Sequence, residues 1–331
     1  MNYFFSIIIP VRQENDYLKE TLKELKKQSY KNFEVLVITD AISKSSNPAH
    51  KRNHGAKMAK GDYLAFLDDD SFPKKDWLKK SNQIFQKQSD LAGLCGPCLT
   101  PPKDSLLQKA SGLVWASHLG SGGAGTYRNR IARARYVDDY PTVNLIINKN
   151  DFFKVKGFDT HHWPGEDTIL CLNLTHKLGK KIYYSPDIIV YHHRRSVIKK
   201  HLQQITRYAI HRGHFSKILP ETSLRIGYLI PSIFTVYTIL LIPLNILLRH
   251  NSNLLLLIDI PLFTYILLMI LTLLDFLLNL KSNFKTSITA VVSIPLTHFY
   301  YGLLFIYGFF LKDLSFQAHQ VDKKTGSYVG G

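Results

Sequence analysis

Three consecutive aspartates, Asp68, Asp69 and Asp70, directly follow an apolar run at residues 63–67. Carboxylates at the end of a buried strand repel one another unless a cation lies between them. Mg²⁺ and Mn²⁺ prefer oxygen ligands, and the phosphate groups of a substrate often complete their sites. The cluster therefore predicts a divalent metal that neutralises charge on a departing diphosphate. An acidic turn without a metal is the alternative interpretation.

The hydrophobic pattern indicates the elements that position this cluster. Apolar runs predict strands at residues 6–10, 33–39 and 63–67, and helical periodicity predicts helices at residues 18–25 and 49–60. Alternation of this kind forms a parallel sheet with right-handed crossovers. Ligands of such sheets bind beyond the carboxyl ends of the strands, so we expect Asp40 and the three aspartates at one site.

The formal net charge of +17 admits nucleic acid, anionic lipid or a phosphorylated substrate as a partner. The sequence shows no recognition helix, zinc finger or RNA-binding signature, so no nucleic-acid partner is expected. The basic excess is densest just before an apolar region, which favours the membrane surface. Three cysteines, Cys95, Cys98 and Cys171, argue against a disulfide scaffold and indicate a reducing compartment.

Residues 198–218 have the pattern of a basic amphipathic helix. Apolar residues recur at helical spacing, and the other face carries Lys199, Lys200, Arg207, Arg212 and Lys217, with His201, His211 and His214. No acidic residue occurs between Ile188 and Pro220. We expect this helix to lie in the plane of the lipid headgroups, and a solvated surface helix is the alternative.

Three apolar segments follow, at residues 226–248, 254–280 and 288–311. Each is long enough to cross a hydrocarbon core of about 30 Å. The second contains Asp259 and Asp275, which would lie about 24 Å apart on a helix and so near opposite interfaces. A re-entrant or interfacial second segment is the alternative. The expected domains are an α/β domain at 1–197, an interfacial helix at 198–224, a membrane region at 225–311 and a polar tail at 312–331.

Several motifs, taken in order, resemble the family 2 glycosyltransferases. They are Ser6-Ile7-Ile8-Ile9-Pro10-Val11, Asp40, Arg52-Asn53-x-Gly55-Ala56-x-x-Ala59-x-Gly61, Phe66-Leu67-Asp68-x-Asp70, Gly157-Phe158-Asp159 and Glu166-Asp167. The resemblance covers about residues 5–197, and the ordered set is far more specific than any one motif. It implies an α/β domain of the GT-A fold, followed here by an α-helical membrane region, a nucleotide-sugar donor and inversion at the anomeric carbon.

The resemblance also implies roles for individual residues. Nucleotide-sugar binding is implied for Pro10, Glu14, Asp40, Arg52, Asn53, Asp68 and Asp69. Asp68 and Asp70 match the D-x-D motif that holds Mg²⁺ or Mn²⁺, with Asp70 as the direct ligand. Asp40 matches the acid that binds the nucleotide base, and a UDP-sugar is the favoured donor. The sequence Thr39-Asp40-Ala41 stands where the family usually has two acids and a glycine. The identity of the nucleotide base therefore remains open.

Asp167 matches the family's catalytic base. Inverting transfer is a single in-line displacement, in which one carboxylate takes the proton of the acceptor hydroxyl on the face opposite the leaving group. Glu166 and Asp167 precede a helical run at residues 169–178, and carboxylates are favoured at helix N-termini. A simple N-terminal cap is the alternative explanation of their position.

Contacts with the acceptor or the diphosphate are expected from Glu166, Trp163, His193, Arg195, Gln204, Arg207 and Tyr208. Gln204-x-x-Arg207-Tyr208 resembles the Q-x-x-R-W motif of membrane-bound family members, with Tyr in place of Trp. That departure and the small membrane region argue against processive synthesis. The chain looks closest to succinoglycan-type transferases, which have three spans and add a single sugar.

These features predict transfer of a sugar from a nucleotide-sugar donor to a lipid-linked or growing glycan. We expect a multi-pass protein of the cell (inner) membrane, with the catalytic domain cytoplasmic and the tail outside. A polyprenyl-phosphate glycosyl synthase is the alternative enzyme, although the basic cluster His192-His193-Arg194-Arg195 favours the first reading. A non-catalytic membrane protein of the same fold is the alternative from another class.

Overall fold

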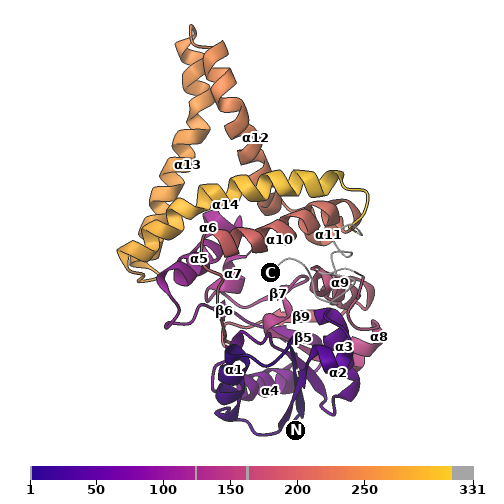
Figure 1. The fold of residues 1–331 in the computed structure, drawn as a ribbon. Coiled ribbons are helices and arrows are strands. Elements are labelled where there is room, and N and C mark those ends of the chain that lie inside the picture. Colours follow the sequence, from indigo (N-terminus) through magenta and orange to yellow (C-terminus); the bar gives the residue numbers. More distant parts are fainter. Residues whose placement is uncertain (1, 124, 162–163, 315–331) are drawn as a thin grey trace. The chain divides into compact units, whose positions relative to one another are not determined.

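The computed structural model describes residues 2–123, 125–161 and 164–314. Within these ranges the chain forms two compact units (Figure 1). The α/β unit combines residues up to 101 with residues 130–193, and the helical unit combines residues 102–129 with residues 194–312. Residues 102–129, expected within the first domain, therefore group with the helices.

The described part of the α/β unit is built on a seven-stranded mixed sheet of order β2-β1-β3-β8-β5-β9-β7. Its strands are β1 (Phe5–Pro10), β2 (Phe33–Ile38), β3 (Tyr63–Phe66), β5 (Leu91–Cys95), β7 (Arg135–Val137), β8 (Leu145–Asn148) and β9 (Lys181–Tyr184). The expected parallel pairing of β1 with β2 and β3 is confirmed. Strand β8 pairs antiparallel with both β3 and β5, which makes the sheet mixed.

The described residues also form a smaller sheet of order β4-β10-β6, whose first strand directly follows the three aspartates in the sequence. Its strands are β4 (Ser71–Pro73), β6 (Cys98–Leu99) and β10 (Val190–His192). β10 runs antiparallel to β4, and His192 is in register with Ser71. This pairing brings the end of β10 beside the segment that follows β3.

The helices of the α/β unit agree with the sequence pattern. They are α1 (Asp16–Lys26), α2 (Asp40–Ser43), α3 (Pro48–Met58), α4 (Trp77–Lys87), α8 (Lys149–Lys154) and α9 (Glu166–Leu172), which continues as a π-helical turn (Asn173–Lys177). The expected helices at residues 18–25 and 49–60 correspond to α1 and α3. The Asn15 side chain caps α1 by accepting a hydrogen bond from the Leu18 amide.

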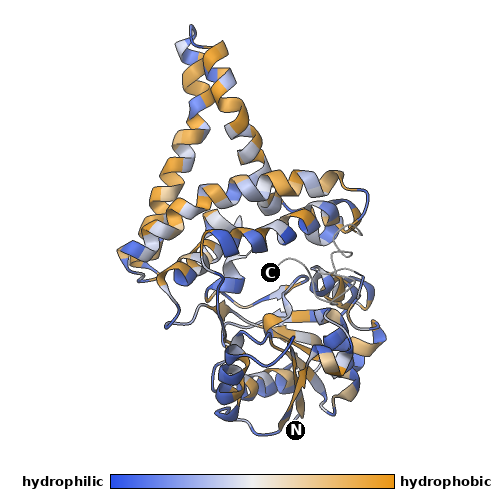
Figure 2. Cartoon of the chain, in the orientation of Figure 1, coloured by the Kyte–Doolittle hydropathy of each residue, from blue (hydrophilic) through white to orange (hydrophobic). Residues whose placement is uncertain are grey.

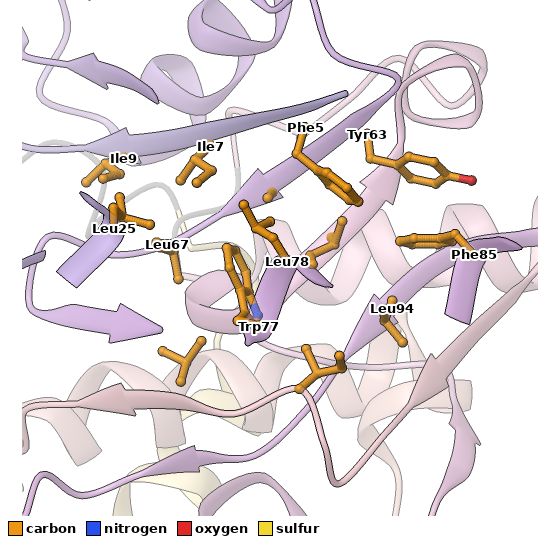
Figure 3. Close-up of a cluster of buried hydrophobic side chains, with 14 of the residues drawn as sticks. Phe5, Ile7, Ile9, Leu25, Tyr63, Leu67, Trp77, Leu78, Phe85 and Leu94 are labelled. Atoms are coloured by element: carbon orange, nitrogen blue, oxygen red, sulfur yellow. The ribbon is translucent and has the colours of Figure 1, made fainter. Parts of the chain in front are cut away.

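The core of this unit surrounds Trp77 (Figure 3). All six residues of β1 are buried, as expected for an inner strand covered on both faces. Phe5 and Ile7 project from β1 into a cluster with Leu78 and Phe85 of α4. This packing fixes β1 and β3, and so fixes where their carboxyl ends lie.

The helical unit consists, in its described part, of eight helices. They are α5 (Leu106–Ala116), α6 (His118–Ser121), α7 (Thr126–Asn129), α10 (Lys199–Ile218), α11 (Pro220–Ser223), α12 (Ile226–Leu247), α13 (Ser252–Leu278) and α14 (Phe284–Phe310). Among the described residues, α12, α13 and α14 are long and apolar enough to cross a membrane. Apolar residues dominate these helices in Figure 2.

The predicted polar face of α10 is only partly exposed. Arg212, expected on the outer face, is buried, and so are His201, His211 and His214. The Arg212 guanidinium lies over the rings of Tyr208 and Tyr228, at 5.2 and 4.6 Å from their centroids. The physical reason is that α10 is covered from more than one side. It packs lengthwise on α14, and Arg212 contacts Ser223 of α11 and Tyr228 of α12. Lys199, Lys200 and Lys217 remain exposed as expected.

Asn144 should be one of the most sensitive positions in the α/β unit. Its buried side chain donates to the Gly96 and Ile188 carbonyls, at 2.7 Å each, and accepts from the Trp77 indole at 3.0 Å. Asn144→Ala should lower the free energy of unfolding by about 3 kcal/mol, because three buried polar groups lose a partner. Thermal unfolding in detergent measures the change. Asn32→Ala is the control, since Asn32 makes its backbone contact at the exposed surface; an equal loss at both positions would contradict the account.

Candidate active site

Arg52 links three segments of the α/β unit. It lies on α3, and its side chain is buried. One guanidinium nitrogen, Nη2, donates to Asp68 Oδ1 at 2.8 Å, and the other, Nη1, donates to Glu166 Oε1 at 2.8 Å. Burial opposes the charge of Arg52, but Asp68 and Glu166 outweigh it and raise the pKa of the guanidinium. Arg52 therefore stays a cation that holds the end of β3 and the start of α9 together.

Asp68, Asp70 and His192 form a group that could hold a metal ion. One ligand atom from each of them lies within 4.8 Å of the others, and no other such group was found among the described residues. His192 Nε2 lies 3.2 Å from Asp70 Oδ1. Two carboxylates and an imidazole suit a divalent ion, and open positions could take substrate phosphate oxygens.

His192 was named from the sequence only as part of a basic cluster and was not proposed as a metal ligand. The signal was present, because His192 ends a short apolar strand, but its place beside the aspartates depends on the pairing of β10 with β4. His193 instead contacts α1, where its Nε2 lies 2.9 Å from Glu20 Oε2 and its ring lies against that of Tyr17, with the centroids 4.7 Å apart and the planes tilted by 38°. Its expected contact with the acceptor or diphosphate stays a prediction.

Asp69 lies apart from the metal-binding group. Its Oδ2 accepts a hydrogen bond from Asn15, the residue that caps α1, at 2.5 Å. Burial raises the pKa of Asp69, with the charges of Asp70 and Asp68 adding to the effect. The middle aspartate thus attaches this segment to α1. The expected contact of Asp69 with the nucleotide sugar stays a prediction.

Asp40 begins α2 at the carboxyl end of β2, as the sheet pattern predicts. Its carboxylate pairs with the buried Lys51 ammonium at 2.5 Å, and Lys51 also donates to the Val11 carbonyl at 3.0 Å. Lys51 therefore joins the ends of β1 and β2 and neutralises Asp40. Sequence reasoning missed Lys51, because an isolated lysine on a helix usually projects into solvent.

Asn53 connects α3 to the Gly157-Phe158-Asp159 motif. Its amide donates to the Phe158 carbonyl at 2.8 Å and accepts from the Phe158 amide at 2.9 Å. Gly157 has a φ of +71°, and a Cβ there would lie 2.7 Å from Asn53 Oδ1. The two motifs therefore depend on each other physically. Both polar groups of the Asn53 amide have backbone partners. The expected contact of Asn53 with the nucleotide sugar stays a prediction.

Glu166 and Asp167 stand at the N-terminus of α9, as predicted. Glu166 is buried, whereas Asp167 is half-buried and its Oδ1 accepts from the Thr168 amide at 2.8 Å. Burial, reinforced by the charge of Asp167 and opposed by Arg52, raises the pKa of Glu166 to about 7. The two neighbours thus differ, with Asp167 the more accessible carboxylate.

The remaining predicted residues lie elsewhere. Pro10 is buried at the end of β1, and Glu14 is exposed in the loop that follows. Trp163 lies outside the described residues. Arg195, Gln204, Arg207 and Tyr208 belong to the helical unit, and their contacts with the acceptor or diphosphate stay predictions.

Residues 6–46 and 42–98 match the family described as glycosyl transferase family 2. Over 246 residues the chain is 24% identical to a dolichyl N-acetyl-alpha-D-glucosaminyl phosphate 3-beta-D-2,3-diacetamido-2,3-dideoxy-beta-D-glucuronosyltransferase of Methanococcus voltae, an alignment that covers 63% of this chain and 73% of that protein. Over 108 residues it is 29% identical to the amylovoran biosynthesis glycosyltransferase AmsB of Erwinia amylovora, covering 25% of this chain and 36% of that protein.

Among solved structures, the chain resembles the mannosyltransferase PcManGT from Pyrobaculum calidifontis in complex with GDP-Man and Mn²⁺. The TM-score is 0.46 at 18% identity, and the alignment covers 66% of this chain and 65% of that chain. The family match together with the mixed sheet makes the α/β unit GT-A-like, as the order of motifs predicted. The match to the family model lies within residues 6–98, in the first part of the α/β unit.

The raised pKa of Glu166 predicts a pH-dependent stability. Its ordinary pKa is 4.5 and its folded value is about 7, so the folded state binds a proton more tightly. The stability that this proton contributes is complete below pH 4.5 and is lost as the pH rises through about 7. Glu166→Gln cannot titrate, so the wild type should lose thermal stability relative to this variant between pH 5 and pH 8. Exposed Glu221→Gln is the control, and a difference between wild type and Glu166→Gln that does not change with pH would refute the assignment.

Proposed function

We propose that this protein is an inverting, metal-dependent glycosyltransferase that uses a nucleotide-sugar donor at the cytoplasmic face of the cell (inner) membrane. The observation that carries the proposal is the convergence of Asp68, Asp70 and His192 beside Arg52, which is joined to the α9 N-terminus through Glu166. In this proposal the metal ligand Asp68 and the α9 turn that carries the base are joined by one buried cation, Arg52.

The donor end of the reaction falls to the metal-binding group. Asp68, Asp70 and His192 would hold Mg²⁺ or Mn²⁺, and such an ion would supply positive charge that stabilises a departing diphosphate. Arg52 donates to Asp68 Oδ1 at 2.8 Å, so it holds that carboxylate in place. Because the described ligands are two oxygens and one nitrogen, Mn²⁺ fits this set at least as well as Mg²⁺.

The acceptor end falls to Asp167. It lies on the first turn of α9, next to Glu166, and is the more exposed of the two. In the proposed step its carboxylate removes the proton of the acceptor hydroxyl while that oxygen attacks the anomeric carbon. Buried Glu166, held by Arg52, positions this turn rather than touching the acceptor.

The nucleotide base is assigned to the carboxyl ends of β1 and β2. Asp40 would accept the imide N–H of a uracil ring, and Lys51 holds the carboxylate of Asp40 in place. A UDP-sugar remains the proposed donor. Guanine also presents an N–H beside a carbonyl, so the proposal is tested by competition between UDP and GDP.

A lipid-linked or growing glycan is the proposed acceptor. The three apolar helices would hold the enzyme at a membrane, and the Methanococcus voltae relative is named for a dolichyl phosphate-linked sugar. The purified protein should be incubated with Mn²⁺, a panel of nucleotide sugars and membrane lipid extract. A glycosylated lipid product supports the proposal. A product in which the sugar is joined directly to a polyprenyl phosphate identifies the alternative synthase, and no turnover of any donor favours a binding protein.

The metal ligands can be tested individually. Asp70→Asn and His192→Gln should each weaken Mn²⁺ binding about tenfold or more, because each removes one donor atom from the group. Calorimetric titration of Mn²⁺ in the presence of UDP measures the affinity. Asp16→Asn and His176→Gln are matched controls at exposed positions. Full transfer activity in excess EDTA would contradict the proposed metal.

Asp167→Asn separates the base from the metal. This substitution keeps the size of the side chain but removes its basicity, so turnover should fall at least about 100-fold while UDP affinity stays unchanged. Asp70→Asn should lower both. Transfer kinetics and UDP affinity are measured on the same preparation, so that misfolding is recognised. Near-normal turnover by Asp167→Asn would move the base to another carboxylate, with Glu166 and Asp159 the next candidates.

A further inference from the structure

Helices α10 and α14 lie side by side and run in the same direction within the helical unit (Figure 1). Near the start of α10, His201 Nε2 lies 3.2 Å from Thr297 Oγ1. In its middle the Thr206 and Tyr300 hydroxyls lie 2.9 Å apart. Near its end, Lys217 donates to the Leu311 carbonyl at 2.6 Å. Later residues of α10 contact later residues of α14, so the two helices are parallel and share one tilt over this length.

Two glycines bring the backbones of these helices into direct contact. A Cβ at Gly213 of α10 would lie 2.1 Å from the Phe305 carbonyl oxygen, and one at Gly308 of α14 would lie 2.1 Å from the Ile210 carbonyl oxygen. No larger side chain fits at either position without separating the helices. The pair therefore behaves as one rigid element, and a bilayer must accommodate both helices in the same orientation.

Helix α10 is unsuited to crossing a membrane. It carries Lys199, Lys200, Arg207, Arg212 and Lys217 and has no acidic residue. A Lys or Arg near the centre of a spanning helix opposes insertion, because the charge must leave water for hydrocarbon. Figure 2 shows the contrast between polar α10 and apolar α12 and α13. The helix is instead suited to the headgroup region, where its exposed lysines meet anionic lipid.

From this geometry we propose that α14, although long enough to cross, lies in the membrane interface alongside α10, and that only α12 and α13 cross. The α10–α14 pair is then a docking surface for the boundary between headgroups and acyl chains of an anionic bilayer. The proposal goes beyond sugar transfer and rests only on membrane attachment.

The exposed stripe of α14 fits this surface. Large apolar residues recur on it every three or four positions, at Ile288, Val292, Leu296, Phe299, Leu303, Tyr307 and Phe310. The opposite side buries polar groups, among them Ser293, Thr297 and His298. A long apolar stripe on one helix, backed by a basic helix, has the character of an interfacial element.

The distribution of basic residues favours two crossings over three. With two crossings, Arg225, Lys281, Lys285 and Lys312 all lie on the side of α10, and Arg249 alone lies at the opposite tip. With three crossings, Lys312, Lys323 and Lys324 would join Arg249 on the far side. Since short cytoplasmic segments are enriched in Lys and Arg, two crossings satisfy the rule where three do not.

The hairpin of α12 and α13 can cross as a unit. Their 22 and 27 residues correspond to about 33 and 40 Å of helix, enough for a hydrocarbon core. Between them, the Tyr237 hydroxyl donates to the Ile258 carbonyl at 3.0 Å, and the Asn245 amide donates to Asp259 at 3.2 Å. Asp259 is thereby paired inside the hairpin.

Cysteine labelling tests the two-crossing arrangement. The native cysteines are buried, so single cysteines at exposed Asp16, Asn251 and Lys312 report separately when a membrane-impermeant maleimide is applied to right-side-out and inverted vesicles. The five residues between His193 and α10 are too short to cross a bilayer, so Asp16 marks the side of α10. Lys312→Cys should label from the same side as Asp16→Cys, and Asn251→Cys from the other. Labelling of Lys312→Cys with Asn251→Cys overturns the proposal.

Spin-label depth measurements give an independent test. Nitroxides at Val292, Leu296 and Leu303 of α14 should show similar accessibility to a water-soluble relaxation agent, because an in-plane helix keeps one depth. Nitroxides at Leu257, Leu267 and Leu278 of α13 are the matched series, and they should show a minimum at the centre. A minimum along α14 as well would show that it crosses. Neither measurement needs turnover, so the result is independent of the proposed transferase activity.

Discussion

The paired ion contacts of Arg52 are the constraint on which the candidate site depends. A buried guanidinium must find carboxylates, and here one nitrogen donates to Asp68 and another to Glu166. These partners come from the end of β3 and the start of α9, which are about a hundred residues apart in sequence. The buried charge therefore fixes the distance between the proposed metal site and the proposed base. Asn53, the next residue on α3, reinforces the same junction through the backbone of Phe158.

The three consecutive aspartates also differ in their contacts. Asp69 is taken up by Asn15, whereas Asp68 and Asp70 approach His192. Because successive side chains point in different directions after the strand, Asp69 anchors the segment while Asp68 and Asp70 are left as candidate metal ligands.

The helical unit has a different requirement, because it carries basic residues and apolar surface next to each other. Burying α10 against α14 leaves lysines and an apolar stripe exposed, which suits a lipid boundary better than water or hydrocarbon alone.

The sequence predicted the elements that rest on local patterns. Strands β1 to β3, their connecting helices and the acids at their ends all follow from periodicity and position. Long-range pairing was not predictable in the same way. The antiparallel insertion of β8 between β3 and β5, and the contact of β10 with β4 that delivers His192, depend on partners far along the chain. Burial of Arg212 and Lys51 was missed for a related reason, since helical periodicity does not show which second helix or loop covers a polar face.

In the proposed sugar-transfer site, Asp68, Asp70 and His192 together hold the metal. Pulsed electron paramagnetic resonance of Mn²⁺ bound to the protein with UDP tests this assignment directly, because an imidazole ligand gives a nitrogen coupling that carboxylate and phosphate oxygens lack. We expect this coupling in the wild type, its loss in His192→Gln, and loss of the bound ion in Asp70→Asn. Mn²⁺ that binds equally well in all three proteins, without a nitrogen coupling in any of them, would contradict the assignment.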